Sequence, residues 1–207
     1  MVNINFIIIF MIIMTNFKEF SNSSDAWNYI INYIKRVGNN IITEDHNMTR
    51  EVQNLVVEIK KPLEGFPIKN SSWDINALNV YAEQLLDFSY DCKGFDYTYN
   101  ERMSRQIYYI TKLLKDHPTT RRATAYLWLP EKDLETNMHH PCQIVADYKL
   151  RLGKLYATHF FRSHDILQAW PTNVYGLAKL QEKIASDLNV LPGSLTTISA
   201  SAHIYID

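Results

Sequence analysis

The sequence predicts an α+β fold (α/β, two-layer), and two patterns along the chain lead to this prediction. Amphipathic helical runs dominate the first half, whereas short β-branched runs follow one another in the second half. No internal repeat, low-complexity tract or Pro/Gly-rich linker interrupts the 207 residues. The length therefore suits a single domain with one substantial core.

Three helices and one strand are expected in the first half. Residues 23–25 offer a cap for a helix that ends at Gly38 and repeats apolar residues on one face. Asp74 opens a second helix, and a third covers residues 104–115 before a proline ends it. Between the first two helices, the β-branched run at residues 55–59 predicts a strand.

The second half is expected to be mainly β-structure. Leu152 and Gly153 separate two apolar runs and predict a hairpin between them. The predicted elements are, in order, strands at residues 123–128, 143–150 and 154–161, a buried helix over residues 174–188 and a last strand at residues 195–200.

Composition and charge narrow the range of functions. Hydrophobic residues make up 46% of the chain and charged residues 21%, as in soluble globular proteins. The net charge of −1 provides no general field for nucleic acid, so any anion site must be local. Cys92 and Cys142 are too few for a disulfide framework, which favours reduced thiols in a cytoplasmic protein. Neither a nucleic acid nor a membrane is expected as a partner.

The N-terminus carries an apolar run of nine residues, at positions 6–14. A transmembrane helix needs roughly 20 residues, and residues 1–5 lack the basic charge of an export signal. An extra strand, or residues upstream of a start at Met14, is favoured over a signal. We therefore treat residues 1–13 as an apolar extension and residues 14–207 as one catalytic domain.

Polar segments in the second half contain groups suited to an anion and a nucleophile. Arg121 and Arg122 are adjacent, so in extended chain they reach one phosphate only at a turn or across a subunit interface; otherwise they form a solvated pair. Cys142 starts an apolar strand, where a lone cysteine is usually a buried hydrophobe. A nucleophilic thiolate needs nearby positive charge, which Arg162 could supply to lower the thiol pKa. The segment around Arg162 also reads as a polar strand end before a helix cap.

Metal and nucleotide-loop sites are not expected. His139 and His140 precede Cys142, but the spacings typical of zinc sites do not occur. The six glycines form no phosphate-binding loop.

Together these segments resemble the thymidylate synthase family, most closely its archaeal-type branch. From Cys142 to Tyr205 the spacing agrees almost residue for residue, and weaker similarity extends upstream to Arg50. The matching blocks are Thr119-Thr120-Arg121-Arg122, Pro141-Cys142, Arg162-Ser163-His164-Asp165, Pro171-Thr172-Asn173 and His203-Ile204-Tyr205. The resemblance implies a large mixed β-sheet packed against helices, thymidylate-synthase-like.

The resemblance also implies an activity, the methylation of dUMP to dTMP in dTTP biosynthesis. Cys142 would add to C6 of the uracil ring, so that C5 can take a one-carbon unit from a reduced pterin of folate or methanopterin type. Asp165 would lie near the base and the cofactor. Glu83 and Tyr99 would steer proton transfers, although Glu83 taken alone is an ordinary exposed helix residue. No metal is implied.

Substrate binding is implied for seven residues. Asn173 would read N3–H and O4 of uracil, although asparagine also suits the N-cap of the following helix. His203 and Tyr205 would bond the 3′-hydroxyl, and Arg50 is a weaker match to a phosphate-binding arginine. Four residues would hold the 5′-phosphate, the first two from a partner subunit of a homodimer: Arg121, Arg122, Arg162 and Ser163. A monomer remains an alternative.

Departures from the family's pattern leave two other functions open. Gln143 replaces a histidine, Phe161 replaces a glutamine and residues 199–201 replace Gly-Gly-Asp, while the tail that closes over the folate has no counterpart after Tyr205. The alternatives are a pyrimidine nucleotide hydroxymethylase and a non-catalytic nucleotide-binding relative. Asn173 favours uracil, because cytidylate-specific relatives carry aspartate there.

Overall fold

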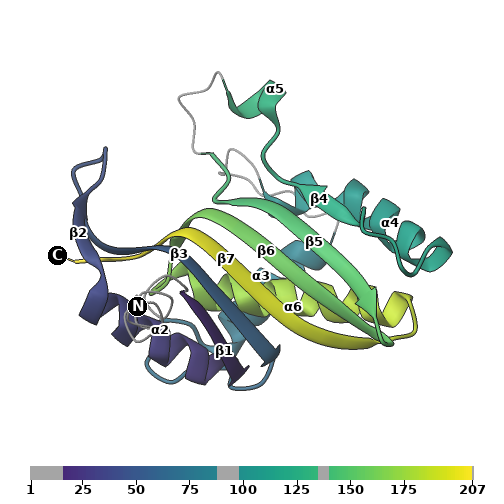
Figure 1. Ribbon diagram of the computed structural model, residues 1–207, viewed down its shortest axis with the longest axis horizontal. Helices are drawn as coiled ribbons and strands as arrows, with labels where there is room; N and C mark the ends of the chain where they lie inside the picture. The colour runs from purple at the N-terminus through teal and green to yellow at the C-terminus, as the bar shows by residue number, and fades with distance from the viewer. Residues whose placement is uncertain (1–15, 88–97, 135–139, 207) are drawn as a thin grey trace, which may run out of the picture.

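A seven-stranded mixed sheet forms the centre of the computed structural model, which describes residues 16–87, 98–134 and 140–206. The strand order is β1-β3-β7-β6-β5-β4, and β2 pairs with β3 (Figure 1). The strands are β1 (Phe17–Asn22), β2 (Asn39–Ile42), β3 (Met48–Lys61), β4 (Thr124–Tyr126), β5 (Gln143–Arg151), β6 (Lys154–Asp165) and β7 (Leu191–Tyr205). The helices are α2 (Ser23–Val37), α3 (Ile75–Leu86), α4 (Tyr99–Asp116), α5 (Pro130–Asp133) and α6 (Ala169–Asp187). The apolar run at residues 6–14 lies outside the described residues.

Strand directions bring distant segments to one end of the sheet. β6 runs parallel to β7, whereas β5 is antiparallel to β6 and β3 is antiparallel to β7. The start of β5, the ends of β6 and β7 and the start of β3 therefore meet at the same end. We call this the nucleophile end, because Cys142 directly precedes β5 there.

The helices bury one face of the sheet. Figure 1 shows α6 along the middle strands, with α2 and α3 on the same side. Two large apolar clusters fill this layer, one between α4, α6 and strands β4–β6, the other between α2, α6 and strands β3 and β7. Along β6 the side chains alternate accordingly: Leu155, Ala157 and Phe161 are buried, while Tyr156 and Phe160 on the opposite face are only half-buried.

Local signals explain several elements. Leu152 and Gly153 have φ values of 49° and 73°, as a two-residue hairpin turn requires, so the predicted β5–β6 hairpin is confirmed. The Asp74 side chain accepts a hydrogen bond from the Ala77 amide at 2.8 Å, so the predicted helix start is also confirmed. The cap of α2 was predicted one residue late, because the Asn22 side chain accepts from the Asp25 amide.

The predicted start of the last helix was wrong by five residues. α6 begins at Ala169 after the N-cap position Gln168. Asn173 therefore lies inside the helix, and its interpretation as an N-cap is wrong. The side chain is buried between α6 and the neighbouring elements, so the amide needs partners from elsewhere in the fold.

Candidate active site

Cys142 and Arg162 are neighbours across the β5–β6 pair. The Arg162 amide donates to the Cys142 carbonyl oxygen at 2.8 Å, and the Cys142 thiol is free and half-buried. The Arg162 guanidinium lies along the turn before Cys142, where Nε donates to the Pro141 carbonyl and Nη2 donates to the His140 carbonyl, each at 3.0 Å. Its other N–H groups are left for an anion. Arg162 thus holds the turn that carries the thiol and places a positive charge beside it.

The pKa of the Cys142 thiol is nevertheless raised above its ordinary value. Burial is the largest cause; the Arg162 charge lowers the pKa, and the Asp165 carboxylate raises it further. The expectation that Arg162 brings this pKa down is therefore wrong for the net effect, because burial of the sulfur outweighs one exposed guanidinium.

Asp165, His203 and Tyr205 end the two central strands at the nucleophile end. Asp165 pairs with His203, and its Oδ1 accepts from the Leu167 and Gln168 amides at 2.9 and 3.1 Å, which fixes the carboxylate ahead of α6. The pKa of Tyr205 is raised, first by burial and then by the charges of Asp165 and Cys142. Asp165 and Tyr205 therefore share one electrostatic environment with the thiol.

Tyr99 and Gln143 lie next to the nucleophile. The Tyr99 hydroxyl, at the start of α4, accepts from the Gln143 amide at 3.3 Å. The Gln143 side chain is fully buried, and its Nε2 contacts Nδ1 of His159 at 2.9 Å. The residue that replaces the family's histidine thus points into the core instead of toward the thiol.

Asn173 contacts two residues that the sequence did not single out. The Tyr81 hydroxyl donates to Asn173 Oδ1 at 2.7 Å, and Asn173 Nδ2 lies 3.3 Å from Nε2 of His164. Burial lowers the pKa of His164 to about 3, with smaller contributions from the charges of His203 and His159, so this ring is neutral at physiological pH. His164 lies inside the segment Arg162–Asp165, which was the available signal; Tyr81 gave none beyond its place two residues before Glu83.

Arg121 and Arg122 lie far from Cys142 within the chain. The Tyr148 amide donates to the Ala123 carbonyl at 2.8 Å, six residues along β5 from the nucleophile, which corresponds to about 20 Å. Both arginines are exposed, and neither guanidinium has a hydrogen bond or ion pair with any described residue.

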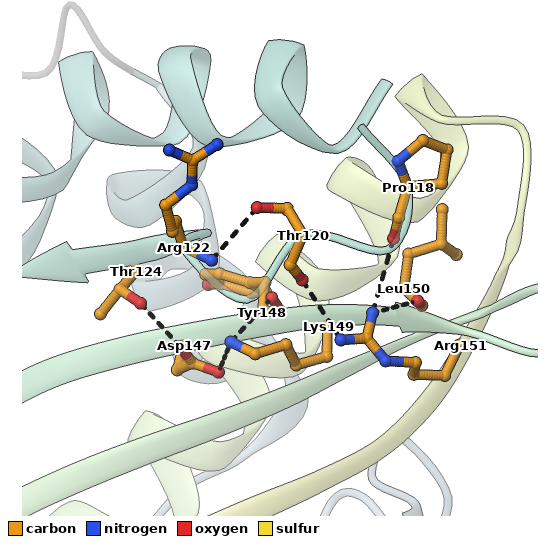
Figure 2. Close-up of polar contacts among 9 residues, drawn as sticks. All are labelled: Pro118, Thr120, Arg122, Thr124, Asp147, Tyr148, Lys149, Leu150 and Arg151. Atoms are coloured by element: carbon orange, nitrogen blue, oxygen red, sulfur yellow. Dashed lines mark hydrogen bonds and ion pairs between the residues drawn. The ribbon is translucent and has the colours of Figure 1, made fainter. Parts of the chain in front are cut away.

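Arg151 supports the turn that carries these arginines. The Arg151 guanidinium donates to the Thr120 carbonyl at 3.2 Å, and the Arg122 amide donates to the Thr120 hydroxyl at 3.2 Å. Figure 2 shows this arrangement, with the Arg122 side chain extending away from β5. An ordered turn therefore presents two free guanidinium groups outward.

The structure says less about three other residues predicted for the site. Ser163 is half-buried on β6, opposite Ser201. Arg50 lies at the nucleophile end, opposite Ile204 on β7, and its Nε is buried without a hydrogen bond from the described residues. Glu83 is exposed on α3, and the described contacts do not link its side chain to Cys142.

Within residues 16–87, 98–134 and 140–206, no three acidic, histidine or cysteine side chains are grouped to hold a metal ion. None of the helices described is both long and apolar enough to span a bilayer.

Known proteins are similar to this chain along nearly its whole length. The family model described as thymidylate synthase matches residues 7–207. Three archaeal proteins that share the name "Putative thymidylate synthase" are similar along most of their length. The one from Methanosarcina acetivorans is 40% identical over 190 residues, covering 89% of this chain and 87% of the relative. The one from Methanothermobacter thermautotrophicus is 37% identical (90% and 92%), and the one from Methanocaldococcus jannaschii is 34% identical (89% and 88%).

The fold prediction is confirmed by a solved structure. Thymidylate synthase from T4 phage superposes with a TM-score of 0.73 over 87% of this chain and 76% of the phage protein, at 19% identity. The family match over nearly the whole chain, together with archaeal relatives above 30% identity, establishes what the residues suggested: the chain belongs to the thymidylate synthase family.

Proposed function

We propose that the protein is a methyltransferase that converts dUMP to dTMP for dTTP synthesis, with residues 14–207 acting as one catalytic domain. The observation that carries the proposal is a half-buried free thiol, Cys142, whose carbonyl accepts from the Arg162 amide, which brings the Arg162 charge near enough to act on the thiol pKa. This chemistry requires a reduced thiol, the state that the cytoplasm maintains, and we place the protein there.

In the proposed reaction the Cys142 sulfur bonds to C6 of the uracil ring. The C5–C6 electron pair moves to C5 and is delocalised toward O4, while the thiol proton leaves for solvent or a nearby base. Because burial raises the pKa of Cys142, the thiol loses its proton during attack and does not rest as a thiolate. Tyr99, beside the Gln143 amide, and Glu83 are the residues we propose to steer the later proton transfers.

A reduced pterin fits the acidic group at the nucleophile end. Asp165 uses Oδ1 for two backbone amides, and Oδ2 has no hydrogen bond from the described residues. That oxygen can accept from the ring N–H groups of a pterin of folate or methanopterin type. When bound, a reduced pterin would supply the one-carbon unit for C5 and the hydride that reduces it to a methyl group, while C5 loses its proton and C6 releases the Cys142 sulfur.

Separate groups of residues bind the base, the sugar and the phosphate of the nucleotide in this proposal. Asn173 reads the uracil edge, while His203 and Tyr205 at the end of β7 bond the 3′-hydroxyl. Arg162 and Ser163 hold the 5′-phosphate from this chain. Arg121 and Arg122 complete that site from a second copy, because about 20 Å separates them from Cys142 within one chain.

The open face of the sheet is the surface through which we propose that two copies associate. Partly exposed apolar side chains lie in register across six strands on this face: Phe17, Val56, Ile198, Phe160, Val145 and Tyr126. A contiguous apolar row of this kind favours burial against another protein surface. A two-fold dimer would pair the row with itself and bring each arginine turn to the partner's nucleophile end.

Covalent trapping tests the proposed chemistry. The protein is incubated with 5-fluoro-dUMP, whose C5 substituent cannot leave as a proton, and its intact mass is measured. Wild type and the Cys92→Ala control should each gain one nucleotide, and Cys142→Ala should gain none. Equal adducts in Cys142→Ala and wild type, or no adduct in wild type, would contradict the proposal.

A non-catalytic nucleotide-binding relative is the second candidate, favoured by the raised pKa of Cys142. Release of tritium from C5-labelled dUMP separates the two functions. Release that depends on Cys142 supports catalysis, whereas binding of dUMP with equal release in wild type and Cys142→Ala supports the non-catalytic candidate. Preferred hydroxymethylation of dCMP would indicate a nucleotide hydroxymethylase instead.

A further inference from the structure

Four side chains from four elements form one continuous chain of hydrogen bonds beneath the proposed base site. The Tyr81 hydroxyl on α3 donates to Asn173 Oδ1 at 2.7 Å, and Asn173 Nδ2 on α6 lies 3.3 Å from His164 Nε2 on β6. His164 Nδ1 then lies 3.0 Å from the Ser199 hydroxyl on β7. We call these four residues the amide relay.

The amide relay has a direction. The structure places the Asn173 oxygen toward Tyr81 and its nitrogen toward His164, and in this arrangement Nε2 of His164 is the acceptor. A neutral histidine that accepts at Nε2 carries its proton on Nδ1 and donates it to Ser199. His164 is neutral because burial lowers its pKa to about 3. The order Tyr81, Asn173, His164, Ser199 therefore runs from donor to acceptor at each step.

Burial makes the relay difficult to rearrange. Asn173, His164 and Ser199 are 6%, 1% and 2% exposed, so a broken bond would leave a polar atom away from water. The ring of Phe161 stacks on that of His164 with centroids 3.8 Å apart and an interplanar angle of 12°. Phe161 and Ser199 are also two of the positions at which the sequence departs from the family's pattern.

Close packing fixes the other end of the relay. Gly176 lies almost one turn after Asn173 on α6, and a Cβ there would stand 2.9 Å from Cε1 of Tyr81 and 2.5 Å from Cδ1 of Leu85. The missing side chain lets α3 approach α6 closely enough for the Tyr81 hydroxyl to reach the carboxamide.

We propose that Tyr81 and His164 determine the base preference of the site by fixing which way the Asn173 carboxamide faces. The inference rests on the proposed function. With one bond of each amide atom used by the relay, Oδ1 can still accept N3–H and Nδ2 can still donate to O4, the pattern of uracil. A carboxamide turned by 180° would match N3 and the 4-amino group of cytosine. Tyr81 and His164 are positioning residues, since they act on the base through Asn173.

The test is Tyr81→Phe, which removes one hydroxyl and keeps the ring. Tyr175→Phe is the matched control, because the Tyr175 hydroxyl also links α6 to α3, donating to Asn79 at 2.6 Å without contacting Asn173. The preference for dUMP over dCMP is measured by calorimetric binding and by C5 tritium release. One lost hydrogen bond should reduce the preference by roughly tenfold in Tyr81→Phe, and it should be unchanged in Tyr175→Phe.

A second pair of variants tests His164. His164→Gln keeps an acceptor for Asn173 Nδ2 and should retain more of the preference than His164→Leu, which keeps none. A role in stability alone would lower the thermal midpoint while leaving the ratio of the two nucleotides unchanged.

The outcomes separate this inference from the proposed function. A wild type that prefers dUMP, with the same preference in Tyr81→Phe, overturns the inference alone. A wild type that binds dUMP in preference to dCMP but releases no tritium leaves the inference standing on the binding ratio and removes the catalytic proposal. A wild type that binds neither nucleotide overturns both.

Discussion

The two ends of strand β5 differ in how completely one chain builds its part of the site. At the start of β5, strand pairing places Arg162 next to Cys142, and Asp165, His203 and Tyr205 end the adjoining strands. At the other end, an ordered turn presents Arg121 and Arg122 to solvent without partners among the described residues. Backbone pairing is sufficient to assemble the first group, whereas the phosphate-binding role proposed for the second group requires a second copy. We therefore propose that the site is divided between two copies.

The largest effect is expected from Arg162, which serves the nucleophile end alone. Arg162→Ala removes two charge-assisted bonds to the turn carrying Cys142 and should slow adduct formation with 5-fluoro-dUMP by roughly a hundredfold. Arg105→Ala is the control, because Arg105 is exposed on α4 and has no hydrogen bond or ion pair with any described residue. Similar adduct rates in the two variants would contradict the role assigned to Arg162.

The second effect concerns the arginine turn. Replacing both Arg121 and Arg122 by alanine should weaken dUMP binding by roughly ten- to a hundredfold, since each guanidinium contributes charge-assisted bonds to phosphate. The thermal midpoint should stay near that of wild type because both side chains are exposed. Calorimetry with dUMP and with unphosphorylated deoxyuridine checks the assignment, and an equal loss for both ligands would argue against phosphate binding.

The third effect tests which charges set the pKa of the Cys142 thiol at the nucleophile end. Because the pKa of Cys142 is raised, alkylation by iodoacetamide in a Cys92→Ala background should be slow at neutral pH and rise roughly tenfold per pH unit into the alkaline range. Asp165→Asn keeps an acceptor for the two amides but removes a charge that raises this pKa. Its alkylation midpoint should therefore move to lower pH; a midpoint at higher pH would contradict the assigned role of Asp165.

The last effect is on stability instead of activity, and it concerns the polar core behind the nucleophile end. Burial lowers the pKa of both His159 and His164 to about 3, so the unfolded chain binds more protons below its ordinary histidine pKa of 6.5. The stability that these neutral histidines contribute is fully present above pH 6.5. It is lost on acidification toward pH 3, by up to about 1.4 kcal/mol per pH unit for each histidine. Urea unfolding between pH 7 and 4.5 measures the slope, which His159→Phe should reduce. A flat profile in wild type would mean that these rings are not buried as neutral groups.

Local sequence signals were sufficient to predict the elements that depend on local interactions. The hairpin at Leu152 and Gly153 and the helix start at Asp74 follow from turn and cap chemistry, and both were predicted at the right residues. Boundaries that depend on pairing were not predicted well. β7 extends over Leu191–Tyr205, beyond its predicted core, because β3 and β6 pair with it on both sides.

The residues of the proposed site could be selected from the sequence, but the energetics at Cys142 could not. The blocks around Cys142 and Arg162 were identified from the sequence because chemical identity and spacing define them. The sign of the net pKa shift at Cys142 was not, since it depends on how deeply the sulfur is buried. The partners of Asn173 were also missed, because Tyr81 lies 92 positions away and meets it only when α3 packs on α6.

The most direct test of the divided site is subunit complementation. Cys142→Ala protein is mixed with the Arg121→Ala/Arg122→Ala double variant under conditions that exchange subunits, and tritium release from dUMP is measured. If the arginines act on the partner's thiol, one of the two sites in each mixed dimer is intact, and activity should recover to roughly a quarter of wild type. If mixing gives no more activity than the separate variants, the cysteine and both arginines serve the same chain, and the divided site is contradicted.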